Sequence, residues 1–143
     1  MVALHREIPV LTLPDPAGRR ISTWDYKQDK PVVLAFAGGD SALAAKLADR
    51  YDEYRKATAE VLLIAPEPPD EDLPFPVLLD ADGAAAARYA ERTPELLVLD
   101  AYGVLEGRFD GAEPDHAAVL GLIAALEMRC PECGVPEWPL EEA

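Results

Sequence analysis

The stretch Val32-Val33-Leu34-Ala35-Phe36-Ala37-Gly38-Gly39-Asp40 decides how this chain folds. Six apolar residues in a row, beginning with two β-branched valines, predict a strand that is buried on both faces. The two glycines end this strand, and Asp40 is a good N-cap for a helix predicted over residues 41–57. A buried strand that leads directly into a helix indicates an α/β domain.

Helical and strand-like patterns alternate along the rest of the chain. Leu43, Leu47, Tyr51 and Tyr54 recur at helical spacing and form the predicted buried face of the first helix. The further predicted elements are a buried strand over 61–64, a short edge strand over 75–79, a helix over 83–92, a hairpin of 96–100 with 103–109, and a helix over 114–128. This order implies a mixed sheet with helices on both faces.

The ends of two predicted helices and one loop also carry sequence signals. Asp82 is the predicted cap of the helix over 83–92, and Pro114 is expected in the first turn of the last helix. In that last helix, Val119, Ile123 and Leu126 form the apolar stripe. Four prolines exclude regular structure from the loop 66–74.

Composition and charge limit the class of protein. Of 143 residues, 50% are hydrophobic and 28% are charged, which is typical of one soluble globular domain. The formal net charge of −14 repels phosphate backbones, so we expect no nucleic-acid partner. The chain shows neither a signal peptide nor an apolar run long enough to span a membrane, so we expect a cytoplasmic protein with reduced thiols and no membrane partner.

Several segments, taken in order, carry a resemblance to a known family. They are 8–15 with 18–22, 25–26 with 30–36, 75–83, Thr93-Pro94, and 96–100 with 103–104. Over residues 8–128 the chain resembles the redoxin branch of the thioredoxin superfamily, the alkyl hydroperoxide reductase/thiol-specific antioxidant group. The resemblance implies an α/β thioredoxin-like fold, with a mixed central sheet flanked by helices, an N-terminal β-hairpin, a cis peptide bond before Pro94 and a short C-terminal tail. It also implies a redoxin domain over 1–129 and a tail over 130–143.

In that family the reactive cysteines lie at the start of the helix after the first central strand, where the helix dipole lowers the pKa of a thiol. Aligned on Phe36 and Gly39-Asp40, the two cysteine positions fall on Ala42 and Ala45. The resemblance therefore implies that peroxide reduction by the family mechanism is not available. Ser41 is expected to be an ordinary first-turn residue, since no histidine is near it in sequence to activate its hydroxyl.

The chain has two cysteines, in Cys130-Pro131-Glu132-Cys133-Gly134. The spacing suits half of a thiolate metal site, and the motif resembles a zinc knuckle. Structural zinc needs four ligands, so the others would come from His5 or His116, or from Cys130 and Cys133 of a second copy in a homodimer. The spacing also suits a reversible disulfide, although the preceding helix C-terminus raises the pKa of a thiol. A pair of reduced thiols with no role is the third alternative.

The sequence thus predicts a redoxin-like domain without a peroxidatic cysteine, most simply a non-catalytic binding or structural module whose tail binds zinc. The alternative is a thiol–disulfide oxidoreductase or antioxidant protein that uses Cys130 and Cys133. We expect His5 and His116 to be ordinary surface or core residues. Trp138 is predicted to anchor the tail or to contact a protein partner.

Overall fold

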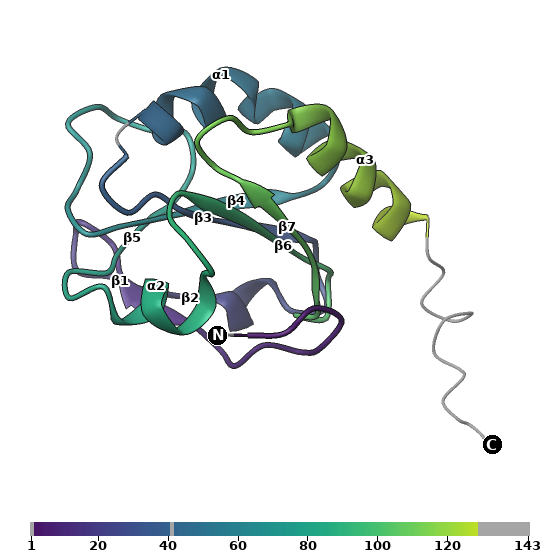
Figure 1. The fold of residues 1–143 in the computed structure, drawn as a ribbon, viewed down its shortest axis with the longest axis horizontal. Helices are drawn as coiled ribbons and strands as arrows, with labels where there is room; N and C mark the ends of the chain where they lie inside the picture. The colour runs from purple at the N-terminus through teal and green to yellow at the C-terminus, as the bar shows by residue number, and fades with distance from the viewer. Residues whose placement is uncertain (1, 41, 129–143) are drawn as a thin grey trace.

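The central sheet is mixed, as predicted. The computed structural model describes residues 2–40 and 42–128. The five strands of this sheet follow the order β5-β4-β3-β6-β7 (Figure 1). β4 pairs in parallel with β3 and with β5, whereas β6 pairs antiparallel with β3 and with β7. The strands are β3 (Val32–Phe36), β4 (Glu60–Ala65), β5 (Val77–Leu79), β6 (Glu95–Leu99) and β7 (Leu105–Asp110).

A separate hairpin begins the chain, as the resemblance implied. β1 (Thr12–Pro14) pairs antiparallel with β2 (Arg20–Ser22), and one 3-10 turn, η1 (Thr23–Tyr26), follows. The buried carboxylate of Asp15 holds the turn between the two strands, because it accepts hydrogen bonds from the backbone N–H groups of residues 17 and 19. These hydrogen bonds give the turn its own local support.

Helices cover both faces of the sheet (Figure 1). α1 (Ala42–Lys56) and α3 (His116–Glu127) lie on one face, and the short α2 (Ala84–Tyr89) lies on the other face with the N-terminal hairpin. Each central strand is buried on both sides, because alternate residues enter the two apolar clusters. The predicted inner faces are confirmed for α1 (Leu43, Leu47, Tyr51, Tyr54) and for α3 (Val119, Ile123, Leu126).

The start of α2 differs from the prediction. Asp82 does accept a hydrogen bond from Ala84 N–H, but Gly83 is the N-cap residue. Gly83 has a φ of +72°, so the chain turns back and the first helical turn faces Asp80. The buried Asp80 carboxylate accepts hydrogen bonds from two free N–H groups, those of residues 85 and 86.

Two other predicted helix ends were wrong. α2 stops at Tyr89 rather than at residue 92, since the chain then becomes extended toward β6. α3 begins at His116, and Asp115 is its N-cap, whereas Pro114 was expected inside the first turn. The reason is that the Asp115 carboxylate accepts a hydrogen bond from Ala118 N–H, an acceptor that a proline side chain does not have.

The remaining predictions differ in how far the structure tests them. No helix interrupts residues 66–76, which confirms the irregular proline-rich loop. Within residues 2–40 and 42–128, no helix has the length and apolar character needed to cross a bilayer. The predicted domain boundary at 129/130 and both cysteines lie outside the described residues.

Candidate functional site

The turn from β3 to α1 is the position at which the resemblance places the reactive cysteines of the family. Gly38 has a φ of +58°, and Asp40 N–H donates a hydrogen bond of 2.9 Å to the carbonyl of Ala37. The Asp40 carboxylate then accepts a hydrogen bond of 2.8 Å from Ala42 N–H. Asp40 therefore acts at the start of α1 as the sequence predicted, and it already occupies one of the free N–H groups there.

The loop of Thr93 packs directly against this turn, and the loop after β7 packs in turn against Pro94. The peptide bond between Thr93 and Pro94 is cis, as the resemblance implied. A Cβ atom placed on Gly38 would lie 2.6 Å from Thr93 Oγ1, and one placed on Gly111 would lie 2.7 Å from the carbonyl carbon of Pro94. β3, β6 and β7 reach the same edge of the sheet, so tertiary structure assembles the site from three distant segments.

The side chains at the two expected cysteine positions are small, apolar and exposed. Ala42 and Ala45 lie in the first turns of α1 with their methyl groups accessible to solvent. A methyl group can neither donate a proton nor attack an electrophile, so these positions supply no nucleophile. Ser41 lies outside the described residues.

An acidic groove runs between this turn and the proline-rich loop. It has a volume of about 470 Å³, and its floor includes Ala44 and Leu63. Among residues 2–40 and 42–128, carboxylates are the only charged groups that line it, with no Lys or Arg. This arrangement disfavours a bound anion and also a thiolate, because both need positive charge or free N–H donors nearby. The four carboxylate residues are Asp40, Glu67, Asp70 and Glu71.

A family profile described as AhpC/TSA family matches residues 4–109, which is most of the chain. The chain belongs to the AhpC/TSA family. This finding confirms the resemblance on which the predicted fold and the two vacant cysteine positions were based.

Solved structures with the same fold cover nearly all of this AhpC/TSA-family chain. The reduced 2-Cys peroxiredoxin of Plasmodium vivax is 12% identical with a TM-score of 0.73, covering 87% of this chain and 96% of that one. A putative thioredoxin from Neisseria meningitidis is 22% identical with a TM-score of 0.72, covering 95% and 99%. A putative thiol:disulfide interchange protein, DsbE, from Chlorobium tepidum is 17% identical with a TM-score of 0.69, covering 88% and 99%. At these identities the likeness establishes the thioredoxin-like fold. A search of curated proteins found no match.

The two histidines of this AhpC/TSA domain lie apart from the groove and have different partners. His116 Nδ1 lies 2.8 Å from the hydroxyl of Tyr54, and their rings meet edge to face. Burial, together with the charge of Arg50, lowers the pKa of His116, so the neutral imidazole accepts a hydrogen bond from the Tyr54 hydroxyl. Burial likewise raises the pKa of Tyr54 to about 12. His5 is exposed, with Nδ1 3.3 Å from Glu106 Oε1.

Nothing in the described part of the chain forms a metal site by itself. No group of three or more His, Cys, Asp or Glu side chains suitable for a metal ion occurs in residues 2–40 and 42–128. The expected ligands Cys130 and Cys133 lie outside this part.

The sequence analysis missed a buried ion pair next to Pro94. Glu95 is 3% exposed, and its Oε1 atom accepts hydrogen bonds from Arg108 Nη1 at 2.9 Å and from Glu91 N–H at 2.9 Å. The same Arg108 nitrogen donates to the carbonyl of Tyr89, so the pair joins β6 and β7 to the end of α2. The sequence signal that could have predicted this pair is Glu95 itself, a charged residue at the start of an otherwise apolar strand.

Proposed function

We propose that this AhpC/TSA-family chain is a binding or structural module that has lost peroxidase activity, and that its tail holds zinc. The observation that carries the proposal is the pair Ala42 and Ala45 at the turn where the family fold presents its thiols. Because the surrounding loops keep their packing, with Thr93 against Gly38, the fold is retained while the nucleophile is absent.

The electrostatics of the groove support the loss of peroxidase chemistry. A reactive thiol is kept as a thiolate by nearby cations or by free N–H groups at a helix N-terminus. Here the described residues that line the groove include carboxylates and no cationic side chain, and Asp40 occupies the N–H of Ala42. The same charge distribution favours neutral or cationic partners over anionic ones.

Zinc in the tail follows from the chemistry of the cysteine pair. Two thiolates separated by two residues supply half of a tetrahedral zinc site with Zn–S distances of about 2.3 Å. Two copies of the chain supply four thiolates, which is a closed structural site with no position left for substrate. A cytoplasmic location, where thiols stay reduced, belongs to the same proposal.

Elemental analysis of protein purified without chelator tests the zinc. We expect about one zinc ion for two chains, and loss of that zinc in Cys130→Ser and Cys133→Ser. Arg129→Gln is the matched control, because it changes the tail without removing a thiolate. Metal-free wild-type protein with two titratable thiols would contradict the zinc proposal.

A peroxide assay tests the loss of the family activity separately. With a dithiol reductant present, the rate of hydrogen peroxide consumption by wild type should not exceed that of the Cys130→Ser/Cys133→Ser double variant. A rate at least tenfold higher for wild type would contradict the non-catalytic function.

The second candidate is a thiol–disulfide oxidoreductase that works through Cys130 and Cys133. It is favoured by the Cys-x-x-Cys spacing and by fold relatives described as a putative thioredoxin and a putative thiol:disulfide interchange protein. It predicts metal-free protein that reduces insulin disulfides and loses that activity in Cys130→Ser. Insulin reduction that persists in Cys130→Ser would exclude this candidate.

A further inference from the structure

The exposed large apolar side chains of residues 2–40 and 42–128 belong to segments at one end of the sheet. We call this the hairpin end, after the β6–β7 hairpin and not the N-terminal hairpin of β1 and β2. It comprises the turn 100–104 between β6 and β7 and the segments that contact that turn. Surface apolar residues scattered singly need no explanation, but a gathering of them marks a contact surface. The exposed fractions are 45% for Leu4, 49% for Val10, 60% for Trp24, 41% for Tyr102 and 85% for Met128.

Tyr102 lies in this turn, and hydrogen bonds connect the segments of Leu4 and Trp24 to the turn or to the residue that follows it. His5 N–H donates to the carbonyl of Leu105 at 2.6 Å, which fixes the segment that carries Leu4. The residues just after η1 reach the same turn, since Gln28 N–H donates to the carbonyl of Ala101. Leu11 N–H bonds to Thr23 Oγ1 at 3.1 Å, which brings the segment of Val10 beside η1.

The described chain finishes near the same end of the sheet but on its other face, because α3 packs with α1 whereas the segments of Val10 and Trp24 pack opposite to them. α3 follows β7 and runs back along it, so its C-terminus points toward the start of β7 (Figure 1). A Cβ atom placed on Gly107 would lie 2.7 Å from Leu122 Cδ2, which puts the middle of α3 over the first residues of β7. Met128 lies six residues, or about 9 Å of helix, beyond Leu122.

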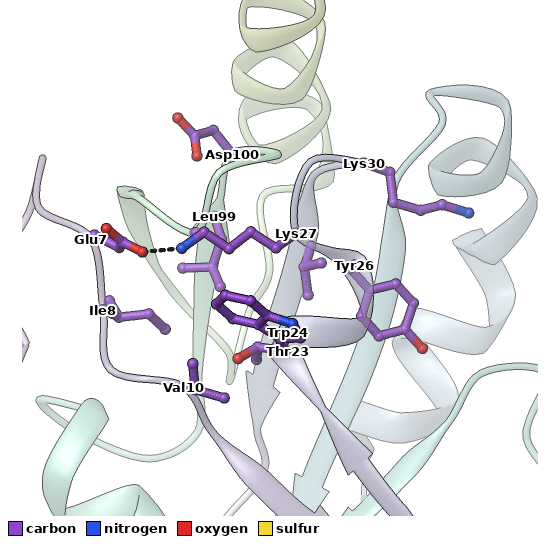
Figure 2. Close-up of a pocket in the computed structure, with 12 residues that line it drawn as sticks. Glu7, Ile8, Val10, Thr23, Trp24, Tyr26, Lys27, Lys30, Leu99 and Asp100 are labelled. Atoms are coloured by element: carbon purple, nitrogen blue, oxygen red, sulfur yellow. Dashed lines mark hydrogen bonds and ion pairs between the residues drawn. The ribbon is translucent and has the colours of Figure 1, made fainter.

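Trp24 is the centre of the exposed surface. Figure 2 shows its indole between Val10 and Lys27, with one edge open to solvent. Lys27 Nζ lies 4.9 Å from the ring centroid and pairs with Glu7. Lys30, on the side of Tyr26, has no ion-pair partner among residues 2–40 and 42–128.

We propose that the tail of this chain docks on the hairpin end, with Trp138 packed against Trp24 and Val10. The tail follows Met128 directly, and the ten residues from Met128 to Trp138 can span up to about 33 Å, enough to pass from the face of α3 around the end of the sheet to Trp24. Residues 129–143 hold four Glu and one Arg, which complements Lys27 and Lys30. An aromatic pair with a cation over one ring is a favourable contact.

This docking is independent of the proposed function. The zinc proposal concerns Cys130 and Cys133, whereas the docking contact uses the segment from Glu137 to Glu142, so either can fail alone. If the zinc proposal and the docking proposal both hold, the cysteine pair is kept beside the hairpin end. The acidic groove lies at the opposite end of the sheet.

Two variants with a single tryptophan test the docking in the full-length chain. The chain has two tryptophans, so Trp138→Phe and Trp138→Ala both leave Trp24 as the only indole. Phenylalanine keeps a ring that can pack on Trp24, and alanine does not. With chelator present, we expect acrylamide to quench Trp24 fluorescence at least twofold more strongly in Trp138→Ala than in Trp138→Phe, independent of protein concentration.

Three results would overturn the proposal. Equal quenching of the two variants would show that Trp138 does not cover Trp24. A difference that disappears on dilution would show that a second copy supplies the covering segment. The NMR chemical shift of the Trp24 indole N–H, compared between wild type and Trp138→Ala, is a second measurement. An unchanged shift would overturn the docking, and it needs no fluorescence from Trp138→Phe.

Discussion

Gly38 is the residue whose identity the site packing restricts most. It has a φ of +58°, and a Cβ atom there would lie 2.6 Å from Thr93 Oγ1. Gly38→Ala therefore combines a strained backbone with a steric overlap, and we expect a loss of about 2 kcal/mol or more in the free energy of unfolding, measured with urea.

The neighbouring glycine is the matched control. Gly39 is exposed, and a Cβ atom placed on it meets nothing within 4 Å. Gly39→Ala should change stability by less than about 0.5 kcal/mol. Equal losses for the two variants would contradict the packing of Gly38 against the loop of the cis-proline.

His116 should make stability depend on pH. Burial lowers its pKa below the unfolded value of 6.5, so the folded state binds a proton less readily than the unfolded chain. The stabilisation that neutral His116 provides is complete above pH 6.5. It is lost as the pH falls through the lowered pKa of His116 in the folded state. Urea unfolding between pH 5.5 and 7 should show stability rising with pH, and His116→Gln should flatten that rise.

His5→Gln is the control for this measurement, because His5 is exposed and does not contact Tyr54. The part of the slope that His116→Gln removes should remain in His5→Gln. If His116→Gln keeps the full slope, another group is responsible and the neutral His116–Tyr54 pair is not the cause.

At the scale of elements, the start of α2 depends on a carboxylate that lies outside the helix. Asp80 accepts hydrogen bonds from Ala85 N–H at 3.0 Å and Ala86 N–H at 2.9 Å, and it is 4% exposed. Asp80→Ala should lower the free energy of unfolding by about 1–2 kcal/mol, because two buried donors lose their acceptor. The exposed Asp82 bonds only Ala84 N–H, so Asp82→Ala should cost less in the same thermal or urea measurement. A larger loss of stability in Asp82→Ala than in Asp80→Ala would contradict the role of Asp80 as the main acceptor at the start of α2.

The pairing of β6 with β7 includes the buried ion pair of Glu95 and Arg108. Removing Arg108 leaves the Glu95 carboxylate without its cation in a nearly dry position. Arg108→Ala should therefore destabilise the domain by about 3–5 kcal/mol in urea unfolding. Adding Glu95→Gln to this variant should recover part of the lost stability. If the stability losses of the two single variants simply add in the double variant, the direct coupling between Glu95 and Arg108 would be contradicted.

At the scale of the whole molecule, a shared zinc predicts a change of mass. Native mass spectrometry should detect two chains with one zinc, about 31 kDa, which is twice the 15.5 kDa of one chain. Chelator should convert this species to the single chain without unfolding the domain, since the described core contains no metal site. A zinc-containing species with one chain would contradict the two-fold site, and the ligands would then have to come from one copy.

Much of the architecture was predictable because its signals are local. The apolar run 32–37, the periodic face of α1 and the prolines of 66–74 each depend on residues close in sequence, and the structure confirms all three. The helix ends at Asp80 and Asp115 were less predictable. Several nearby aspartates can cap a helix, and the path of the preceding backbone decides which one does.

The candidate site was predictable only in part. The vacant cysteine positions 42 and 45 and the cis-proline followed from the family resemblance, whereas the Glu95–Arg108 pair and the acidic character of the groove did not. Asp40 and Glu71 are 31 positions apart in sequence, and both line the groove because β3 and β4 end side by side.

By itself the sequence determined the fold class, the order of the elements, the alanines at positions 42 and 45 where the resemblance places the family's cysteines, and the presence of one Cys-x-x-Cys pair. Only the tertiary structure decided that four carboxylates share one groove, and that the exposed Val10 and Trp24 lie side by side at one pocket. The physical reason is that hydrophobic periodicity acts over a few residues, while charge and exposure depend on which distant segments the sheet brings together.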